Sequence, residues 1–424
     1  MSALEIFPIY HALHAEIYVP GSKSLTTRAL LIAALAAGKT RLTNALFSDD
    51  THIFAQALQA LGFDIQLDPT HMEMTVTGLD GHIPAKQAQL FCGNAGTAAR
   101  FLAAFLTLGD GEFVLDGDER MRARPIGDLI SALIQLGACV EISSSNCPPI
   151  KISASGLLGG QTSIAGDVSS QFLSGLLMVS PYAKQPVEIK VITELNSKPY
   201  IDLTLSVMCD FGVEIERDGY QRYVIHPTRY QSKETYLIES DASAASYFFA
   251  APAVCTGTVR VENIARRSKQ GDIAFLDILQ RMGCIVTMGA DYIEVTSSST
   301  LRGVEVDMRD IPDTAQTLAA IAPFASTPTH ISGIATARVK ETDRVTATCT
   351  ELTRLGVQVE EHSDGMTIHP CKSFRPAKIQ TYNDHRMAMA FSLIGLRVHG
   401  LLIENPACVS KTFPNFFDVL RNLQ

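Results

Sequence analysis

A junction between an amphipathic stretch and an alternating stretch recurs along the chain, and a glycine marks it each time. The junctions are Leu61-Gly62, Leu136-Gly137, Phe211-Gly212, Met282-Gly283 and Leu355-Gly356, at glycine intervals of 75, 75, 71 and 73 residues. After the glycine, apolar and polar residues alternate, as they do around Val357 and Val359. Each junction therefore predicts a helix that ends at a left-handed glycine and leads into a strand. Their recurrence predicts repeated supersecondary units that bury their apolar faces against one another.

Each unit also contains an earlier helix, and polar residues collect where these helices begin. The six openings start at Gly21, Gly93, Gly166, Ser240, Pro312 and Asn383. Nearly unbroken apolar sequence follows, as in 29–35 and 388–396, and a helix that is apolar on every face must be buried. The second helix of each unit is amphipathic, as in 126–136 and 345–355, so it can face water. Six α/β units in 424 residues divide most simply into two domains of three.

The two ends of the chain are expected to meet in one unit. The sixth copy, 413–423, reaches the C-terminus before its strand can form. The chain begins instead with strand-like residues, Ile6, Ile9 and 16–19. We therefore expect the N-terminus to complete the last unit.

Composition narrows the class of protein. A net charge of −9 without a basic stripe argues against nucleic acid as a partner. The apolar runs are too short to cross a bilayer, so no membrane partner is expected. The first ten residues lack the regions of a secretion signal, and the nine cysteines form no CxxC pair, so reduced thiols in the cytoplasm are expected. The 11 histidines show no HExxH or similar metal-binding spacing.

Cations are the unexpected residues at the predicted helix starts, because the positive end of a helix dipole disfavours them. Capping accounts for Ser, Asp, Asn and Gly at these places. It does not account for Lys23, Arg28, Lys340, Arg344, Arg386 and Lys411. Cations gathered at several helix N-termini predict anionic ligands, which use the side-chain charges together with the backbone N–H groups.

Each candidate taken alone also has a structural explanation. Lys23 and Arg28 can extend past a buried helix into solvent, and Arg124 can be a surface residue. Asp313 is at a place where N-caps are common. The segment 338–344 can be a solvated helix start with charge pairs four residues apart. The recurrence of such residues at equivalent places in the repeats favours the functional interpretation.

Ten motifs then occur in the order that they have in a known family. They are PGSKS with Arg28, GNAGTAAR, ARPIGDL, SSQFLSGLL, SKPYIDLTL, SDASAASYF, IPDTA, RVKETDR, YNDHRMAMAFSL and KTFPNFF. Over essentially its whole length the chain resembles the 5-enolpyruvylshikimate-3-phosphate synthase family. The resemblance implies a two-lobed inside-out α/β barrel built from six βαβαββ repeats, three per lobe. The implied lobes are 21–239, mainly for binding shikimate 3-phosphate, and 1–20 plus 240–424, with the catalytic carboxylates and phosphoenolpyruvate binding.

The resemblance also implies the reaction. The family transfers the enolpyruvyl (1-carboxyvinyl) group of phosphoenolpyruvate to the 5-hydroxyl of shikimate 3-phosphate by addition and elimination, and it releases phosphate. This is a step of the shikimate pathway to chorismate and the aromatic amino acids. The resemblance implies no metal or cofactor, only small-molecule substrates, and a cytoplasmic monomer. In this family the herbicide glyphosate occupies the phosphoenolpyruvate site.

Residues carried over by matching position form three groups. For shikimate 3-phosphate, the resemblance implies Lys23, Ser24, Arg28, Ser169, Ser170, Gln171, Ser197, Tyr200, Asp313, Thr336 and Lys340. For phosphoenolpyruvate, it implies Lys23, Asn94, Gly96, Arg124, Gln171, Arg344, His385, Arg386 and Lys411. For catalysis, we expect Asp313 to be the base toward the hydroxyl and Glu341 the proton donor to carbon, with Lys23 and Lys411 at the leaving phosphate. Cations suit this task because the two anionic substrates repel each other.

Two positions depart from the family pattern. Thr336 stands where the family commonly has Asn, which affects one expected hydrogen bond to shikimate 3-phosphate. Phe101 stands where close relatives usually have proline, on the helix that begins at Gly96.

Two other functions compete with this one. UDP-N-acetylglucosamine enolpyruvyltransferase shares the fold and the donor, but the position of its reactive cysteine, five residues before Arg124, is Glu119 here. The other alternative is a catalytically inactive relative that binds anions. Asp313 and Glu341 disfavour it, because they add negative charge that anion binding alone would avoid.

Overall fold

The computed structural model describes residues 3–297 and 300–423. The chain divides into two compact units, of which unit 1 comprises Met1–Pro20 and Glu239–Gln424, and unit 2 comprises Gly21–Ile238. The chain therefore passes between the units twice, after Pro20 and after Ile238. None of the helices in the described ranges has the length and apolar character that crossing a membrane requires.

Three four-stranded sheets of one design form unit 2, and in each the first pair of strands is parallel and the other two pairs are antiparallel. The first sheet has the order β14 (Thr235–Leu237), β3 (Ala37–Thr43), β5 (Glu73–Leu79), β4 (Asp64–Asp68). The second is β6 (Gln87–Phe91), β7 (Asp110–Asp116), β9 (Ile150–Ser155), β8 (Cys139–Ile142). The third is β10 (Gly160–Ile164), β11 (Val187–Val191), β13 (Arg222–Ile225), β12 (Glu216–Asp218).

Unit 1 repeats this design with one variation. Two of its sheets have the orders β2 (Leu13–Tyr18), β15 (Gly257–Glu262), β17 (Tyr292–Ser297), β16 (Ile285–Met288) and β18 (Glu305–Asp307), β19 (Thr329–Ser332), β21 (Gly365–Ile368), β20 (Val359–His362). The third contains β22 (Lys378–Ile379), β23 (Leu401–Glu404) and β1 (Ala3–Ile6). Strand β1 pairs antiparallel to β23, with Ala3 opposite Glu404. The expectation that the N-terminus completes the last unit is confirmed.

Two strands lie in a different unit from the helix that follows them in the sequence. Strand β2 precedes the first helix of unit 2, yet it pairs parallel to β15 of unit 1. Strand β14 precedes Ala242–Cys255, a helix of unit 1, yet it pairs parallel to β3 of unit 2. Unit 1 is consequently discontinuous in sequence, because residues 1–20 supply strands to two of its three sheets.

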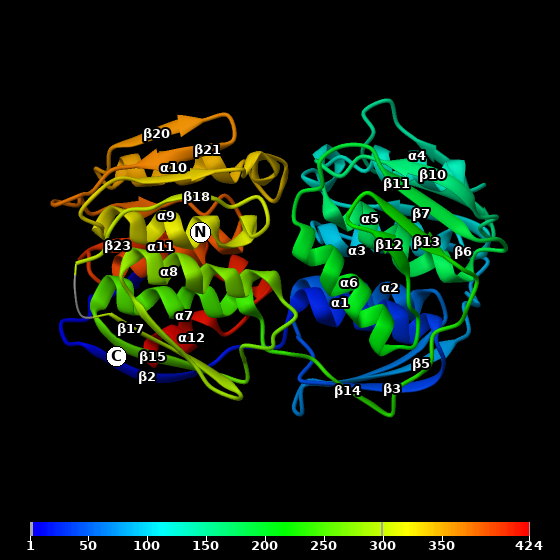
Figure 1. The fold of residues 1–424 in the computed structure, drawn as a ribbon, viewed down its shortest axis with the longest axis horizontal. Helices are drawn as coiled ribbons and strands as arrows, with labels where there is room; N and C mark the ends of the chain where they lie inside the picture. The colour runs from blue at the N-terminus through cyan, green and yellow to red at the C-terminus, as the bar shows by residue number, and fades with distance from the viewer. Residues whose placement is uncertain (1–2, 298–299, 424) are drawn as a thin grey trace. The chain divides into compact units, whose positions relative to one another are not determined.

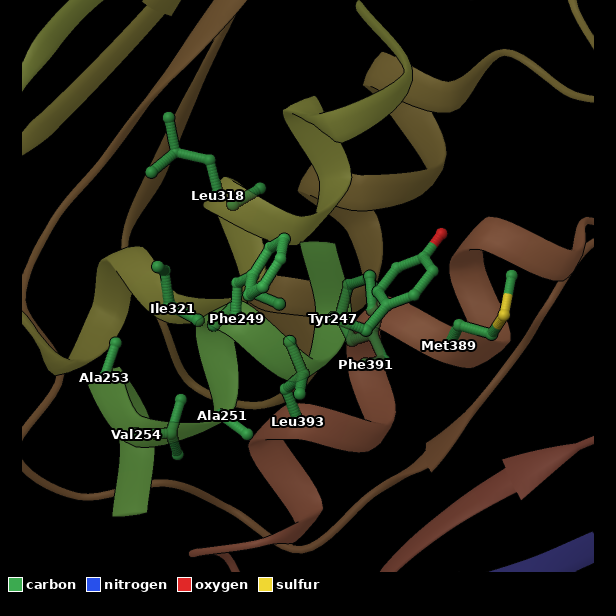
Figure 2. Close-up of a cluster of buried hydrophobic side chains, with 14 of the residues drawn as sticks. Tyr247, Phe249, Ala251, Ala253, Val254, Leu318, Ile321, Met389, Phe391 and Leu393 are labelled. Atoms are coloured by element: carbon green, nitrogen blue, oxygen red, sulfur yellow. The ribbon is translucent and has the colours of Figure 1, made fainter. Parts of the chain in front are cut away.

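The first helix of each repeat is buried, as the sequence predicted. These helices are α1 (Lys23–Leu35), α3 (Gly96–Leu106) and α5 (Ser170–Val179) in unit 2, and α7 (Ala242–Cys255), α9 (Ala315–Ile321) and α11 (His385–Gly395) in unit 1. In unit 1, α7, α9 and α11 pack against one another between the strands β20 and β21 on one side and β2, β15 and β17 on the other (Figure 1). Side chains of these three helices, among them Phe249, Leu318 and Phe391, meet in the core (Figure 2).

The second helix of each repeat is shared between core and solvent. These helices are α2 (Asp49–Ala60), α4 (Gly127–Gln135), α6 (Lys198–Asp210), α8 (Phe275–Met282), α10 (Arg344–Arg354) and α12 (Phe416–Arg421). At the ends of five of them, Gly62, Gly137, Gly212, Gly283 and Gly356 have φ of 96°, 92°, 86°, 111° and 87°. This left-handed conformation suits glycine, which has no Cβ to clash. The helix-to-strand junctions that the sequence predicted are confirmed.

Candidate active site

In unit 1 the carboxylate of Asp313 forms ion pairs with three cationic side chains. Asp313 lies in the short 3-10 helix η4 (Pro312–Thr314), which leads into α9. Its Oδ1 lies 2.8 Å from Nζ of Lys340 and 3.1 Å from Nη1 of Arg344, and its Oδ2 lies 2.7 Å from Nη2 of Arg386. Arg344 is the first residue of α10 and Arg386 the second of α11, so the starts of three helices meet at this carboxylate.

Glu341 lies in the same cluster. Its Oε2 accepts a hydrogen bond of 2.8 Å from Arg344, and its Oε1 lies 4.0 Å from Nζ of Lys411, at the end of the 3-10 helix η7 (Pro406–Lys411). The structure thus brings together six residues that the sequence singled out in unit 1: Asp313, Lys340, Glu341, Arg344, Arg386 and Lys411.

Asp384 is a member of the cluster that sequence reasoning did not assign. It is fully buried, caps α11 by accepting from the backbone N–H of Arg386 at 2.9 Å, and binds Arg344 Nε at 2.7 Å. His385 follows it, also fully buried, with Nδ1 3.5 Å from an oxygen of Asp384. The sequence signal was present in the NDHR motif, but an aspartate at a helix start is usually only a cap.

The segment 338–344 combines buried and exposed charges. The side chains of Arg344 and Glu341 are 3% and 7% exposed, and their partner Asp384 is 0% exposed. The side chains of Arg338, Lys340 and Asp343 are 24%, 26% and 40% exposed, so the segment is solvated only in part. Removing charges from water costs free energy that mutual attraction only partly returns. The buried part of this network, made by Arg344, Glu341 and Asp384, is therefore weak evidence for a role in stability.

This network shifts the pKa values of Lys340 and Arg344 in opposite directions. Burial lowers the pKa of Lys340, and the positive charge of Arg344 lowers it further, against the opposing effect of Asp313. Burial also acts to lower the pKa of Arg344, but the carboxylates of Asp384, Glu341 and Asp313 outweigh it and the pKa is raised. Arg344 is thus a permanent cation, whereas the Lys340 ammonium is a better proton donor than a lysine in water.

In unit 2 the central cation is Arg28, which is fully buried on α1. Its Nε donates to Thr204 at 2.8 Å and its Nη1 to the carbonyl of Ser24 at 3.0 Å. Its Nη2 donates to Ser174 at 3.2 Å and to the carbonyl of Tyr200 at 3.3 Å. Arg28 therefore ties α1, α5 and α6 together, and burial lowers its pKa to about 10.

A second cation of unit 2, Arg124, follows the 3-10 helix η1 (Met121–Ala123) and contacts the residues before α3. Its Nη1 donates to Oδ1 of Asn94 at 2.9 Å. A Cβ at Gly96 would come within 2.4 Å of the Arg124 guanidinium, so any other residue there would displace this group from its present position. Arg100 donates to the carbonyl of Pro125 at 2.8 Å and thereby holds the segment that carries Arg124. The sequence did not assign Arg100.

The polar residues at the other helix starts of unit 2 have mixed surroundings. Ser169 caps α5 by accepting from the backbone N–H of Gln171. The side-chain amide of Gln171 donates to Thr97 on α3 at 3.2 Å. Ser170 is the first residue of α5. Ser197 precedes α6 with φ of 58°, a conformation that costs free energy and often occurs at functional sites.

Lys23 and Thr336 complete the set of predicted residues. Nζ of Lys23 lies 3.6 Å from the buried carboxylate of Asp50 on α2, a partner that the sequence did not assign. Thr336 lies in the 3-10 helix η6 (Ala335–Val339), which immediately precedes Lys340. All nine cysteines are free thiols.

Comparison with known proteins gives one answer at the level of family, sequence and fold. The family model for EPSP synthase (3-phosphoshikimate 1-carboxyvinyltransferase) matches residues 9–420. Proteins named 3-phosphoshikimate 1-carboxyvinyltransferase from Nostoc punctiforme and Shewanella denitrificans are 48% and 49% identical over 418 and 420 residues, 98% of each chain. The structure of EPSP synthase from Acinetobacter baumannii superimposes with a TM-score of 0.82 at 26% identity and covers 99% of this chain and 98% of that one.

The repeated α/β fold and this match together place the chain among the transferases. The chain belongs to the EPSP synthase (3-phosphoshikimate 1-carboxyvinyltransferase) family. It is an enolpyruvyl transferase of the shikimate pathway, and the alternative activity on UDP-N-acetylglucosamine is not favoured. The family-level expectation from the motifs is confirmed.

Proposed function

We propose that the residues gathered at the helix starts bind shikimate 3-phosphate and phosphoenolpyruvate and carry out the transfer. Unit 2 would mainly bind shikimate 3-phosphate, through Lys23, Ser24, Arg28, Ser169, Ser170, Gln171, Ser197 and Tyr200, and unit 1 would add Asp313, Thr336 and Lys340. Phosphoenolpyruvate would be bound by Lys23, Asn94, Gly96, Arg124, Gln171, Arg344, His385, Arg386 and Lys411. The support is the cation-rich surroundings described above, which suit phosphate and carboxylate groups.

The proposed reaction has two steps. In the addition, Asp313 accepts the proton of the 5-hydroxyl, and the hydroxyl oxygen bonds to C2 of phosphoenolpyruvate. Glu341 delivers a proton to the methylene carbon, which becomes a methyl group. In the elimination, a methyl proton returns to a base, the bond from C2 to the phosphate oxygen breaks, and phosphate leaves. Lys23 and Lys411 offset the charge of the leaving phosphate. No metal or cofactor is part of this scheme.

One observation carries this proposal more than any other, and it is the carboxylate of Asp313 held by Lys340, Arg344 and Arg386. A site that only bound anions would not place a carboxylate that is 15% exposed among the cations. The contact of 2.8 Å with Lys340, whose pKa is lowered, gives Asp313 a neighbour with which it can share a proton.

The test is phosphate release from phosphoenolpyruvate with each of two acceptors. We expect release with shikimate 3-phosphate and none with UDP-N-acetylglucosamine. Release with the sugar nucleotide would replace this function with the alternative one. Binding of both shikimate 3-phosphate and phosphoenolpyruvate without release would favour an inactive relative.

We further propose that the enzyme is a cytoplasmic monomer that acts on small molecules and on neither nucleic acid nor membranes. The net charge of −9 and the free cysteines support this proposal. Light scattering coupled to size exclusion would give the mass of one chain, 45.9 kDa, if the proposal is right.

A further inference from the structure

Asp272 is a buried carboxylate near the Asp313 cluster that neither the motifs nor the proposed mechanism uses. It lies in the 3-10 helix η3 (Gly271–Ala274) and is 4% exposed. The hydroxyl of Ser243, in the first turn of α7, donates to its Oδ2. Gln270, two residues before Asp272, accepts a hydrogen bond from the backbone N–H of Ala242 at 3.0 Å, so this segment is fixed to the start of α7.

The first two turns of α7 lie beside the helices that surround Asp313, because Ser246 pairs with Thr317 of α9 at 3.0 Å and the Tyr247 hydroxyl accepts from Arg386 at 3.5 Å. Both η3 and η4 pack against α7. Arg386, which binds Asp313 at 2.7 Å, also interacts electrostatically with Asp272, and the two carboxylates repel each other. Asp241, the cap of α7, also raises the pKa of the Asp272 carboxyl through its negative charge. Asp277 on α8 is exposed to solvent.

Asp313 needs a second negative charge nearby if it is to work as a base. Three cations hold its carboxylate, and cations favour the ionised form of an acid, which makes it a weak proton acceptor. A general base works best when its proton affinity is matched to the working pH. A second negative charge close by would offset the cations, because it makes a proton on Asp313 less unfavourable.

We propose that Asp272 is a positioning residue for the transfer reaction, whose negative charge, acting directly and through Arg386, keeps Asp313 basic enough to accept the hydroxyl proton. This inference rests on the proposed function, because it takes Asp313 as the base. Asp272 itself touches neither substrate in this scheme.

The ionisation of Asp272 supplies a signature for this role. Burial raises the pKa of the Asp272 carboxyl to about 6, and the charge of Asp313 raises it too, against the hydrogen bond from Ser243 and the charge of Arg386. Above that pH the charge is present and Asp313 is assisted. Below it Asp272 is neutral and the assistance disappears.

The experiment compares the full-length enzyme with Asp272→Asn, which removes the charge and keeps a side-chain oxygen for Ser243. The ratio of kcat/KM for wild type to that for the variant is measured from pH 5 to pH 8, so that titration of the substrates themselves cancels. We expect a ratio of roughly tenfold above pH 6, the factor for one pKa unit. The ratio should fall toward one at pH 5. A ratio that stays constant over this range overturns the proposal.

Two controls separate the possible failures. Ser243→Ala removes the hydrogen bond that favours ionised Asp272, so it should move the inflexion of kcat/KM to higher pH and leave the neutral plateau intact. If Asp272→Asn does not fold, an unmoved inflexion in Ser243→Ala overturns the proposal by itself. Asp277→Asn, on the exposed side of α8, should change nothing. Near-normal turnover in Asp313→Asn would remove the base itself, which is a failure of the proposed function and is distinct from both results.

Discussion

At the scale of single residues, one arginine, Arg344, connects the carboxylates of the candidate active site. Asp313, Glu341 and Asp384 share Arg344, whose guanidinium binds all three within 3.1 Å. Arg344 thus fixes the distance between the proposed base and the proposed proton donor. Arg28 has the corresponding place in unit 2, where it holds the helices α1, α5 and α6 together.

The first prediction concerns the two carboxylates. Asp313→Asn and Glu341→Gln keep the size of each side chain and remove its ability to exchange a proton. We expect binding of both substrates to be retained, and kcat to fall by roughly 10²–10⁴-fold, the usual contribution of a general acid or base. Calorimetry and phosphate release measure the two quantities. Asp418→Asn, on the exposed surface of α12, is the matched control, and normal turnover in either active-site variant would remove that residue from the mechanism.

The second prediction concerns Phe101, one of the two departures from the family pattern. Its ring lies under the Arg28 guanidinium, with 5.3 Å between Cζ and the ring centroid, and both side chains are buried. Phe101→Leu keeps an apolar side chain but loses the cation–π contact, which is worth about 2 kcal/mol when it is buried. We expect KM for shikimate 3-phosphate to rise up to roughly thirtyfold, while KM for phosphoenolpyruvate stays the same.

The control for Phe101 lies one turn further along the same helix. Phe105 is also fully buried, but its ring packs on Phe63 at 5.8 Å between centroids and not on a cation. Phe105→Leu should therefore cost stability without changing either Michaelis constant. Equal effects of the two substitutions on shikimate 3-phosphate would show that only packing is involved.

At the scale of elements, the start of α11 depends on an irregular loop. Tyr382 and Asn383 both have left-handed backbone, with φ of 53° and 55°, although neither is glycine. Glu351, fully buried on α10, accepts from the Tyr382 hydroxyl at 2.8 Å and from the backbone N–H of Gln380 at 3.1 Å. These two hydrogen bonds hold the loop that delivers Asp384 to Arg344.

The third prediction tests this support. Tyr382→Phe leaves one buried oxygen of Glu351 without this donor, which should lower the free energy of unfolding by about 1–3 kcal/mol. Because the loop carries Asp384, kcat should fall as well. Denaturant unfolding and phosphate release measure the two effects. Tyr236→Phe is the control, since its hydroxyl binds Asp210 near the far end of α6, and it should leave kcat unchanged.

At the scale of the whole molecule, the path of the chain makes the two units unequal. Unit 2 is continuous, and its three sheets draw every strand from Gly21–Ile238, β14 included. Unit 1 needs β1 and β2 from residues 1–20, which lie in two different sheets. A missing strand exposes backbone groups and apolar surface that the rest of the sheet cannot cover.

The fourth prediction follows from this difference. The segment 21–238, produced alone, should fold with a cooperative thermal transition, whereas 239–424 alone should not. Joining residues 1–20 to 239–424 through a flexible linker should restore the transition. Circular dichroism during heating measures all three, and a cooperative transition in 239–424 alone would show that β1 and β2 are dispensable.

The sequence by itself determined the features that depend on neighbouring residues. The glycines of the five junctions, the buried helices and the cations at their starts are local patterns, since a helix end or an apolar face is encoded within a few turns. Together with the ordered motifs they were enough to predict the two-lobed α/β fold, the family and the reaction. The N-terminal strand was also predictable, because the sixth repeat is visibly incomplete.

Only the tertiary structure decided which of these residues are partners. Asp313 meets Lys340, Arg344 and Arg386 across 27, 31 and 73 residues of chain. An aspartate at a helix start has the same sequence pattern whether it caps the helix or also binds a distant arginine, so Asp50, Asp272 and Asp384 were not assigned. The physical reason is that capping is a local interaction, whereas a charge pair and the burial that strengthens it exist only after distant segments have packed together.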